Sequence, residues 1–190
     1  MRSLRSILLM VFFSFPVLCR AEESCLWLNA ATAGGVLGGA VTATVSPANA
    51  HTPKVQTANA KSSAGPLSAD PEVAGYAGNG MDDSDCTFLR QPPIAGALRI
   101  QVRTLSTPAK EFASYKARCS PHAVPLQAIG NEAFACDLKE KSGRLSEQVV
   151  GRVRERAFVI RLRIDDASIS QSLLREKAQK VAETVAGNLF

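Results

Sequence analysis

Alternating apolar and polar residues dominate the second half of the chain and predict β-strands that bury one face. In the segment 157–164, every second residue is Phe, Ile or Leu, and arginines occupy two of the positions between them. The same pattern, interrupted by turn-forming Gly, Pro and Asn residues, predicts further strands. Their ranges are 85–90, 97–105, 124–129, 132–138 and 145–154.

The first predicted elements are a short helix and a strand. Asn29 is a suitable N-cap for a helix over 30–37, and Gly38 can end that helix in a left-handed conformation. Residues 40–46 then alternate Val or Ala with Thr, as a half-buried strand does.

Two more helices are expected among the strands. Pro108 loses no needed hydrogen-bond donor at a helix start, which predicts a helix from there to about Arg118. The last helix is expected from about Ser168 to Leu189, with one apolar face. That face comprises Leu173, Leu174, Ala178, Val181, Ala182 and Val185.

This order of elements predicts an α+β fold, an antiparallel sheet of about five to six strands with helices packed on one face. Residues 47–83 are mostly small, polar and turn-forming, and bury too little apolar surface to offset their ordering entropy. We therefore expect a flexible loop or insertion there. Residues 22–46 and 84–190 would form one domain around it.

The amino terminus has the three parts of a secretory signal peptide. Arg2 and Arg5 precede an apolar run that ends near Leu18, and small residues at 19 and 21 fit a cut after Ala21. The run is shorter than the ~20 apolar residues that span a membrane. We expect a periplasmic or secreted protein that is not membrane-spanning and has lost residues 1–21. Its formal charge would fall from +5 to +2 with the arginines at 2, 5 and 20.

Four cysteines remain after this cut: Cys25, Cys86, Cys119 and Cys136. In an exported chain they indicate two disulfides, for which three connectivities exist. Zinc is disfavoured because no two of them lie two to four residues apart. Their places in the predicted elements favour Cys25–Cys86, which ties the first helix to the core, and Cys119–Cys136, which joins the second helix to a nearby strand.

No catalytic, metal or cofactor site is expected. His51 lies in the predicted loop, and a nucleophilic pair of Cys119 with His122 would be abolished by oxidation of the cysteine. Asp165 and Asp166 are interpreted as acids that favour the positive end of the following helix.

A cluster of Asp82, Asp83 and Asp85 is interpreted as a solvated turn, because its spacing matches no calcium loop.

Several short motifs resemble a family of small exported domains. They are Cys25-Leu26-Trp27-Leu28-Asn29-Ala30-Ala31 closed by Val36-Leu37-Gly38, then Cys86-Thr87-Phe88, Ile129-Gly130-Asn131-Glu132-Ala133-Phe134, the hairpin 152–164 and the final helix. The family is that of LpqN-like actinobacterial lipoproteins, whose fold is similar to that of the photosystem extrinsic protein PsbP. The resemblance implies a binding or assembly module. This chain departs from it in its long insertion and in lacking a lipid-attachment cysteine.

Arginines recur at outward positions of three predicted strands. If the strands share one sheet, one face carries Arg99, Arg103, Arg152, Arg154, Arg161 and Arg163. The face is either an ordinary solvated sheet surface or a candidate anion-binding surface, since guanidinium groups bind carboxylate and phosphate in bidentate fashion. Anionic lipid, an acidic polymer or an envelope protein are the expected partners. Nucleic acid is disfavoured because aromatic residues for base stacking are nearly absent there.

The function predicted from these observations is a non-enzymatic binding or assembly module of the cell envelope. The alternative is a small envelope hydrolase whose site carries no recognised motif.

Overall fold

The computed structural model describes residues 24–47, 83–119, 123–139 and 144–190. The predicted signal peptide and nearly all of the predicted loop 47–83 lie outside these residues.

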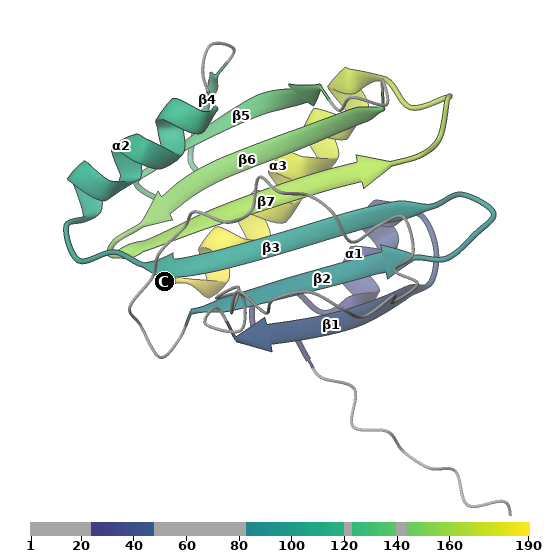
Figure 1. The fold of residues 1–190 in the computed structure, drawn as a ribbon, viewed down its shortest axis with the longest axis horizontal. Coiled ribbons are helices and arrows are strands. Elements are labelled where there is room, and N and C mark those ends of the chain that lie inside the picture. The colour runs from purple at the N-terminus through teal and green to yellow at the C-terminus, as the bar shows by residue number, and fades with distance from the viewer. Residues whose placement is uncertain (1–23, 48–82, 120–122, 140–143) are drawn as a thin grey trace, which may run out of the picture.

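Within the described residues, seven strands form one antiparallel sheet in the order β1-β2-β3-β7-β6-β5-β4 (Figure 1). The strands are β1 Val41–Pro47, β2 Ser84–Arg90, β3 Gly96–Thr104, β4 Val124–Leu126, β5 Glu132–Lys139, β6 Leu145–Val153 and β7 Arg156–Ile164. The α+β class is as predicted, but the sheet is larger than five to six strands. The central pair, β3 and β7, joins segments far apart in the sequence.

The helices are α1 Ala30–Leu37, α2 Pro108–Arg118 and α3 Gln171–Asn188. In Figure 1, α1 and α3 lie behind the sheet, whereas α2 lies on its other side. The prediction that all helices cover one face is therefore wrong. The physical reason is a second, smaller apolar patch: Phe112 and Tyr115 of α2 pack with Val150 and Val159, which point away from α1 and α3.

The main core lies between the sheet and the helices α1 and α3. It contains the alternate residues of β3 and β7, including Ile100 and Ile160, and the inner face of α3. That inner face is the predicted one with two changes: Leu173 is 40% exposed, and Ala186 is buried in addition.

Gly151 allows an unusually close approach within this core. A Cβ atom at that position would overlap the ring of Phe158, which lies directly opposite in the β6–β7 ladder. Phe158 is fully buried. The absence of a side chain at residue 151 is therefore required for the native position of the ring.

Side-chain caps mark the starts of α1 and α3. The Asn29 side chain accepts a hydrogen bond from the Thr32 amide, and Gly38 ends α1 with a positive φ of 81°, as predicted. The start of α3 differs from the prediction, because Ser170 supplies its cap. Asp166 instead accepts from Ser168 within the preceding turn, so interpreting this acid as a helix-dipole partner was wrong.

Both disulfides link elements across the fold. Cys25, just ahead of α1, bonds to Cys86 of β2, and Cys119, at the end of α2, bonds to Cys136 of β5. These are the two pairs predicted from the sequence. Disulfides are typical of proteins in oxidising, extracytoplasmic compartments. No helix in the described part of the chain is long and apolar enough to cross a membrane.

Candidate functional site

Four arginines lie on the sheet face opposite α1 and α3. Arg99 and Arg103 belong to β3, and Arg161 and Arg163 belong to β7. They share a face because residues two apart on a strand point the same way. The antiparallel register places Arg99 directly opposite Arg161. We call these four residues the arginine face.

Asp85 of β2 is the carboxylate in the middle of this face. Its Oδ2 accepts hydrogen bonds from Arg99 at 2.8 Å and from Gln101 at 3.0 Å, and its Oδ1 lies 2.7 Å from Nη2 of Arg103. The Asp85 side chain is 3% exposed, that of Arg103 is 5% exposed and that of Arg99 is 25% exposed. Arg103 is thus a buried ion-pair partner of Asp85, whereas the side chain of Arg99 is partly exposed to solvent.

Burial alone would raise the pKa of Asp85, because a low-dielectric surrounding disfavours the charged form. Hydrogen bonds from Arg99 and Gln101 and the charge of Arg103 outweigh burial and lower the pKa. Asp85 therefore remains ionised at neutral pH. Its carboxylate neutralises one charge of the arginine face.

Asp83 is also buried and accepts a hydrogen bond from the Thr104 amide. The interpretation of Asp83 and Asp85 as a solvated turn is wrong, since both anchor the β2–β3 ladder. Asp82 lies outside the described residues.

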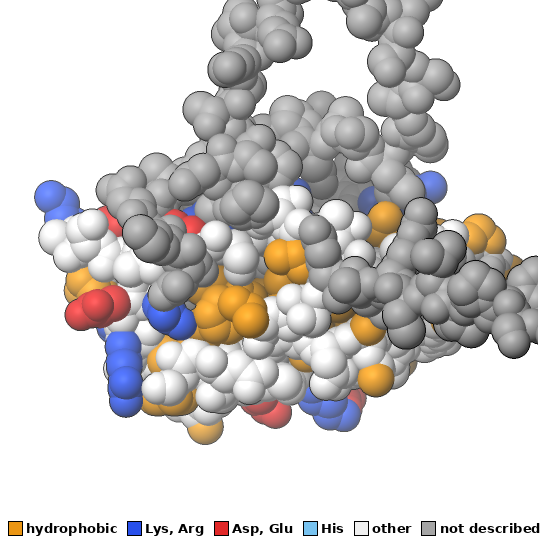
Figure 2. All heavy atoms as spheres, turned by 90° about the horizontal axis from the view of Figure 1, so that it is seen from below, with side chains coloured by type: hydrophobic (Ala, Val, Ile, Leu, Met, Phe, Trp, Pro, Cys, Tyr) orange, Lys and Arg blue, Asp and Glu red, His pale blue; other side chains and the backbone are white. Residues whose placement is uncertain are grey.

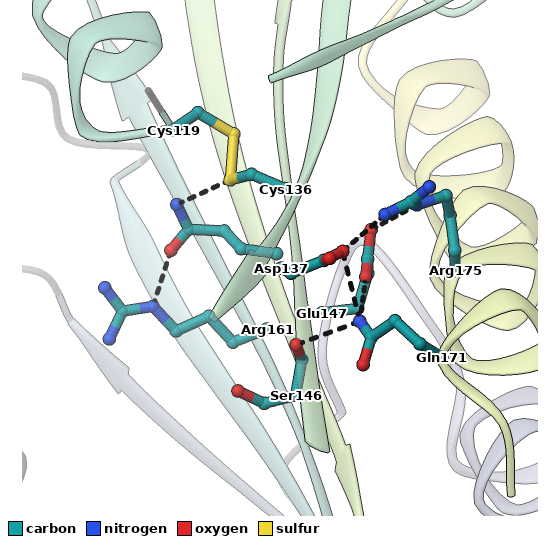
Figure 3. Close-up of a disulfide and its surroundings, with 9 residues drawn as sticks. Cys119, Cys136, Asp137, Ser146, Glu147, Arg161, Gln171 and Arg175 are labelled. Atoms are coloured by element: carbon teal, nitrogen blue, oxygen red, sulfur yellow. Dashed lines mark hydrogen bonds and ion pairs between the residues drawn. A yellow bond between two sulfur atoms is a disulfide. The ribbon is translucent and has the colours of Figure 1, made fainter. Parts of the chain in front are cut away.

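Arg161 contacts a neutral partner. Its Nε donates to the Gln148 side-chain oxygen at 2.8 Å, and the Gln148 amide group lies 3.8 Å from the sulfur of Cys136 (Figure 3). The disulfide therefore adjoins the residue that positions Arg161. Within the described part of the chain, no carboxylate lies in ion-pair contact with this guanidinium group.

Further hydrogen-bonding atoms on the arginine face have no partner among the described residues. The Nε atoms of Arg99 and Arg103 and the side-chain oxygen of Gln101 are buried without a hydrogen bond. Because these atoms are buried and both arginines are ion-paired with Asp85, they belong to the contact between β2 and β3 and add no donor to the exposed surface.

The other predicted arginines differ in their surroundings. Arg163 lies 3.5 Å from Asp165 and is 18% exposed. Arg152 is on the same face, but both of its contacts to Glu132 are 3.0 Å, so its charge is paired.

Arg154 does not extend β6, as the predicted strand 145–154 required. It occupies the turn before β7 with a φ of 53°, and its guanidinium group lies over the ring of Phe190. Its side chain is therefore directed to the end of the chain and away from the arginine face.

A second polar cluster was missed in the sequence. Glu147 is fully buried on the side of α3, where it contacts Gln171 and lies 2.9 Å from Nε of Arg175 (Figure 3). Burial raises its pKa more than these two residues lower it. The sequence does indicate this buried carboxylate, because Glu147 is an acidic residue at a core-facing position of the alternating strand 145–154. Complete burial makes this carboxylate structural, because a substrate cannot reach it.

The nucleophilic pair considered from the sequence is absent in the oxidised protein. Cys119 is disulfide-bonded, and His122 and His51 lie outside the described residues. No group of three or more His, Cys, Asp or Glu side chains in the described ranges is arranged to hold a metal ion.

Comparison with known proteins identified no matching family model, no matching curated protein and no matching solved structure.

Proposed function

We propose that this chain is an exported, non-enzymatic binding or assembly module that contacts an anionic partner through the arginine face. One observation carries the proposal. Arg161 is placed beside Arg99 on adjacent strands, and its closest polar partner among the described residues is the neutral amide of Gln148.

Like charges on directly opposed residues of an antiparallel ladder are destabilising. The charge of Asp85 offsets the repulsion between Arg99 and Arg161 only in part, because the same carboxylate also forms an ion pair with Arg103. An anion bound between Arg99 and Arg161 would supply the missing charge. Guanidinium groups of two directly opposed residues can bind carboxylate or phosphate oxygens with charge-assisted hydrogen bonds.

The resemblance to LpqN-like domains is itself part of the proposal, and it supports a binding or assembly role. An envelope hydrolase is the second candidate. Histidine, the most common general base of such enzymes, occurs only at positions 51 and 122, which lie outside the described residues.

The test uses the secreted protein with Arg161→Gln and Arg163→Gln together. Binding to vesicles with phosphatidylglycerol and to polyglutamate is measured by sedimentation at several salt concentrations. We expect binding of the parent protein to one of these probes, weakening as salt screens charges over about 8 Å at physiological ionic strength. The double variant should bind at least tenfold more weakly.

A matched control removes two charges elsewhere, with Lys110→Gln on α2 and Lys180→Gln on α3. Both lysines are exposed. Equal binding by the double variant and the parent, with both folded, would refute the proposal. Equal weakening by the control would show attraction to net charge and would likewise refute a dedicated surface.

A further inference from the structure

The β1 edge of the sheet carries no charge. From Ser24 to Pro47 the chain contains no Asp, Glu, Lys or Arg, and this stretch includes all of α1 and β1. Figure 2 views the molecule from this side, where uncharged and hydrophobic side chains make up much of the visible described surface, with one basic group beside the central hydrophobic side chains and further charged groups nearer the border. No strand in the described ranges pairs with the outer edge of β1.

An edge strand without charged residues is unusual. Edge strands present unpaired backbone N–H and C=O groups, and proteins commonly protect them with lysine, inward-pointing charges or proline. Over its first six residues, β1 has none of these devices and consists of β-branched or small residues. Depletion of charged residues is also the compositional signal of the centre of a protein interface.

The sequence of β1 also reads the same in both directions. Val41-Thr42-Ala43-Thr44-Val45 is a palindrome centred on Ala43. In antiparallel pairing with an identical strand, each residue would face its own kind. Thr42 would lie opposite Thr44 of the other copy, and Val41 opposite its Val45. Threonine pairs and β-branched pairs are favourable across strands, and a two-fold interface requires such self-complementarity.

We propose that the β1 edge binds a second copy of this chain, with the two-fold axis at Ala43, so that two sheets join into one continuous sheet. Val41, Ala43 and Val45, which pack on the main core, would then form one apolar row with the same residues of the second copy. The exposed Thr42 and Thr44 form the opposite row.

The register is tested with two single variants, Thr42→Cys and Thr44→Cys. In the proposed dimer these positions are directly opposed, with Cβ atoms about 4.5 to 5.5 Å apart. Residue 42 of one copy and residue 42 of the other lie diagonally across the strand pair, about 7 to 8 Å apart, and the same holds for the two copies of residue 44. This separation is too large for a direct disulfide bond. Under mild oxidation, a covalent dimer should form when the two variants are mixed and not with either alone. Equal cross-linking by each variant alone would overturn the register.

The assembly itself is tested by sedimentation velocity. The parent should have twice the mass of the variant with Thr42→Lys and Thr44→Lys, because that variant places lysines opposite each other. The control variant with Ala113→Lys and Thr184→Lys carries the same added charge at exposed positions of α2 and α3 and should remain dimeric. A parent that stays monomeric up to its solubility limit, or a dimer unchanged by the edge lysines, would overturn the proposal.

Discussion

Replacing Asp85 by asparagine should destabilise the fold strongly. The carboxylate contacts Arg99, Gln101 and Arg103 and is 3% exposed. The variant keeps the shape of the side chain but removes its charge. Arg103, itself 5% exposed, would then be a buried cation without an ion-pair partner among the described residues.

The expected loss follows from this burial. Breaking a buried ion pair by removing one partner costs about 3 to 5 kcal/mol, because the remaining charge is left uncompensated. Arg99 contributes little to this loss, since it is 25% exposed and water can solvate it. We therefore expect about 3 kcal/mol for Asp85→Asn, a large fraction of the ~5 to 15 kcal/mol of a typical domain.

Urea unfolding with intact disulfides measures this loss. Trp27 is the only tryptophan, it is buried, and its indole donates to Ser84, the residue before Asp85. Its fluorescence should report the transition directly. With a slope of about 1 to 3 kcal/mol per molar urea, the midpoint should fall by about 1 to 3 M. Glu176→Gln is the control, since its carboxylate is 59% exposed and its ion pair with Lys180 lies on the surface.

The pH dependence supplies a second readout. The pKa of Asp85 is lower in the folded protein than its ordinary 3.8. Its stabilising contribution is therefore complete above pH 3.8 and is lost as the pH falls through the folded value. The difference between parent and variant should shrink at low pH. A loss below about 1 kcal/mol, typical of surface ion pairs, would contradict the reasoning. So would a loss that does not change with pH.

Three further predictions concern the core. Gly151→Ala should cost about 1 to 3 kcal/mol in urea unfolding by displacing the ring of Phe158, and an unchanged midpoint would contradict this packing. Replacing Cys119 and Cys136 together by alanine should cost about 3 kcal/mol from the 17-residue separation; a loss under 1 kcal/mol would show that the bond contributes little. Because burial raises the pKa of Glu147, the stability of the parent relative to Glu147→Gln should fall as the pH rises above 4.5. A constant difference from pH 4 to 8 would oppose a buried, shifted carboxylate.

Local signals predicted much of the fold. Asn29 and Gly38 bounded the first helix, and the period-two alternation located the long strands. The start of the last helix was misplaced because two neighbouring polar residues compete for similar roles. Asp166 bonds within its own turn, and Ser170 caps the helix. Such a choice depends on the path of the preceding turn, which residue types alone do not determine.

Long-range pairing limited the prediction of the candidate site. The arginines of β3 and β7 were assigned to one face, but Asp85 reaches them only through the β2–β3 register, and α2 covers the end of that face. Glu147 could have been noticed as an acid in an apolar row. Its partner Arg175 comes from α3 and depends on tertiary packing.

The central claim is that the arginine face binds an anion, and the most direct test observes the guanidinium groups themselves. Two-dimensional ¹H–¹⁵N spectra resolve arginine Nε–H groups, assigned here by single Arg→Lys variants and titrated with polyphosphate. The account predicts shifts at Arg99 and Arg161, while Arg152, paired with Glu132, stays unchanged. Shifts confined to exposed Arg144, or no shift at any arginine, would contradict it.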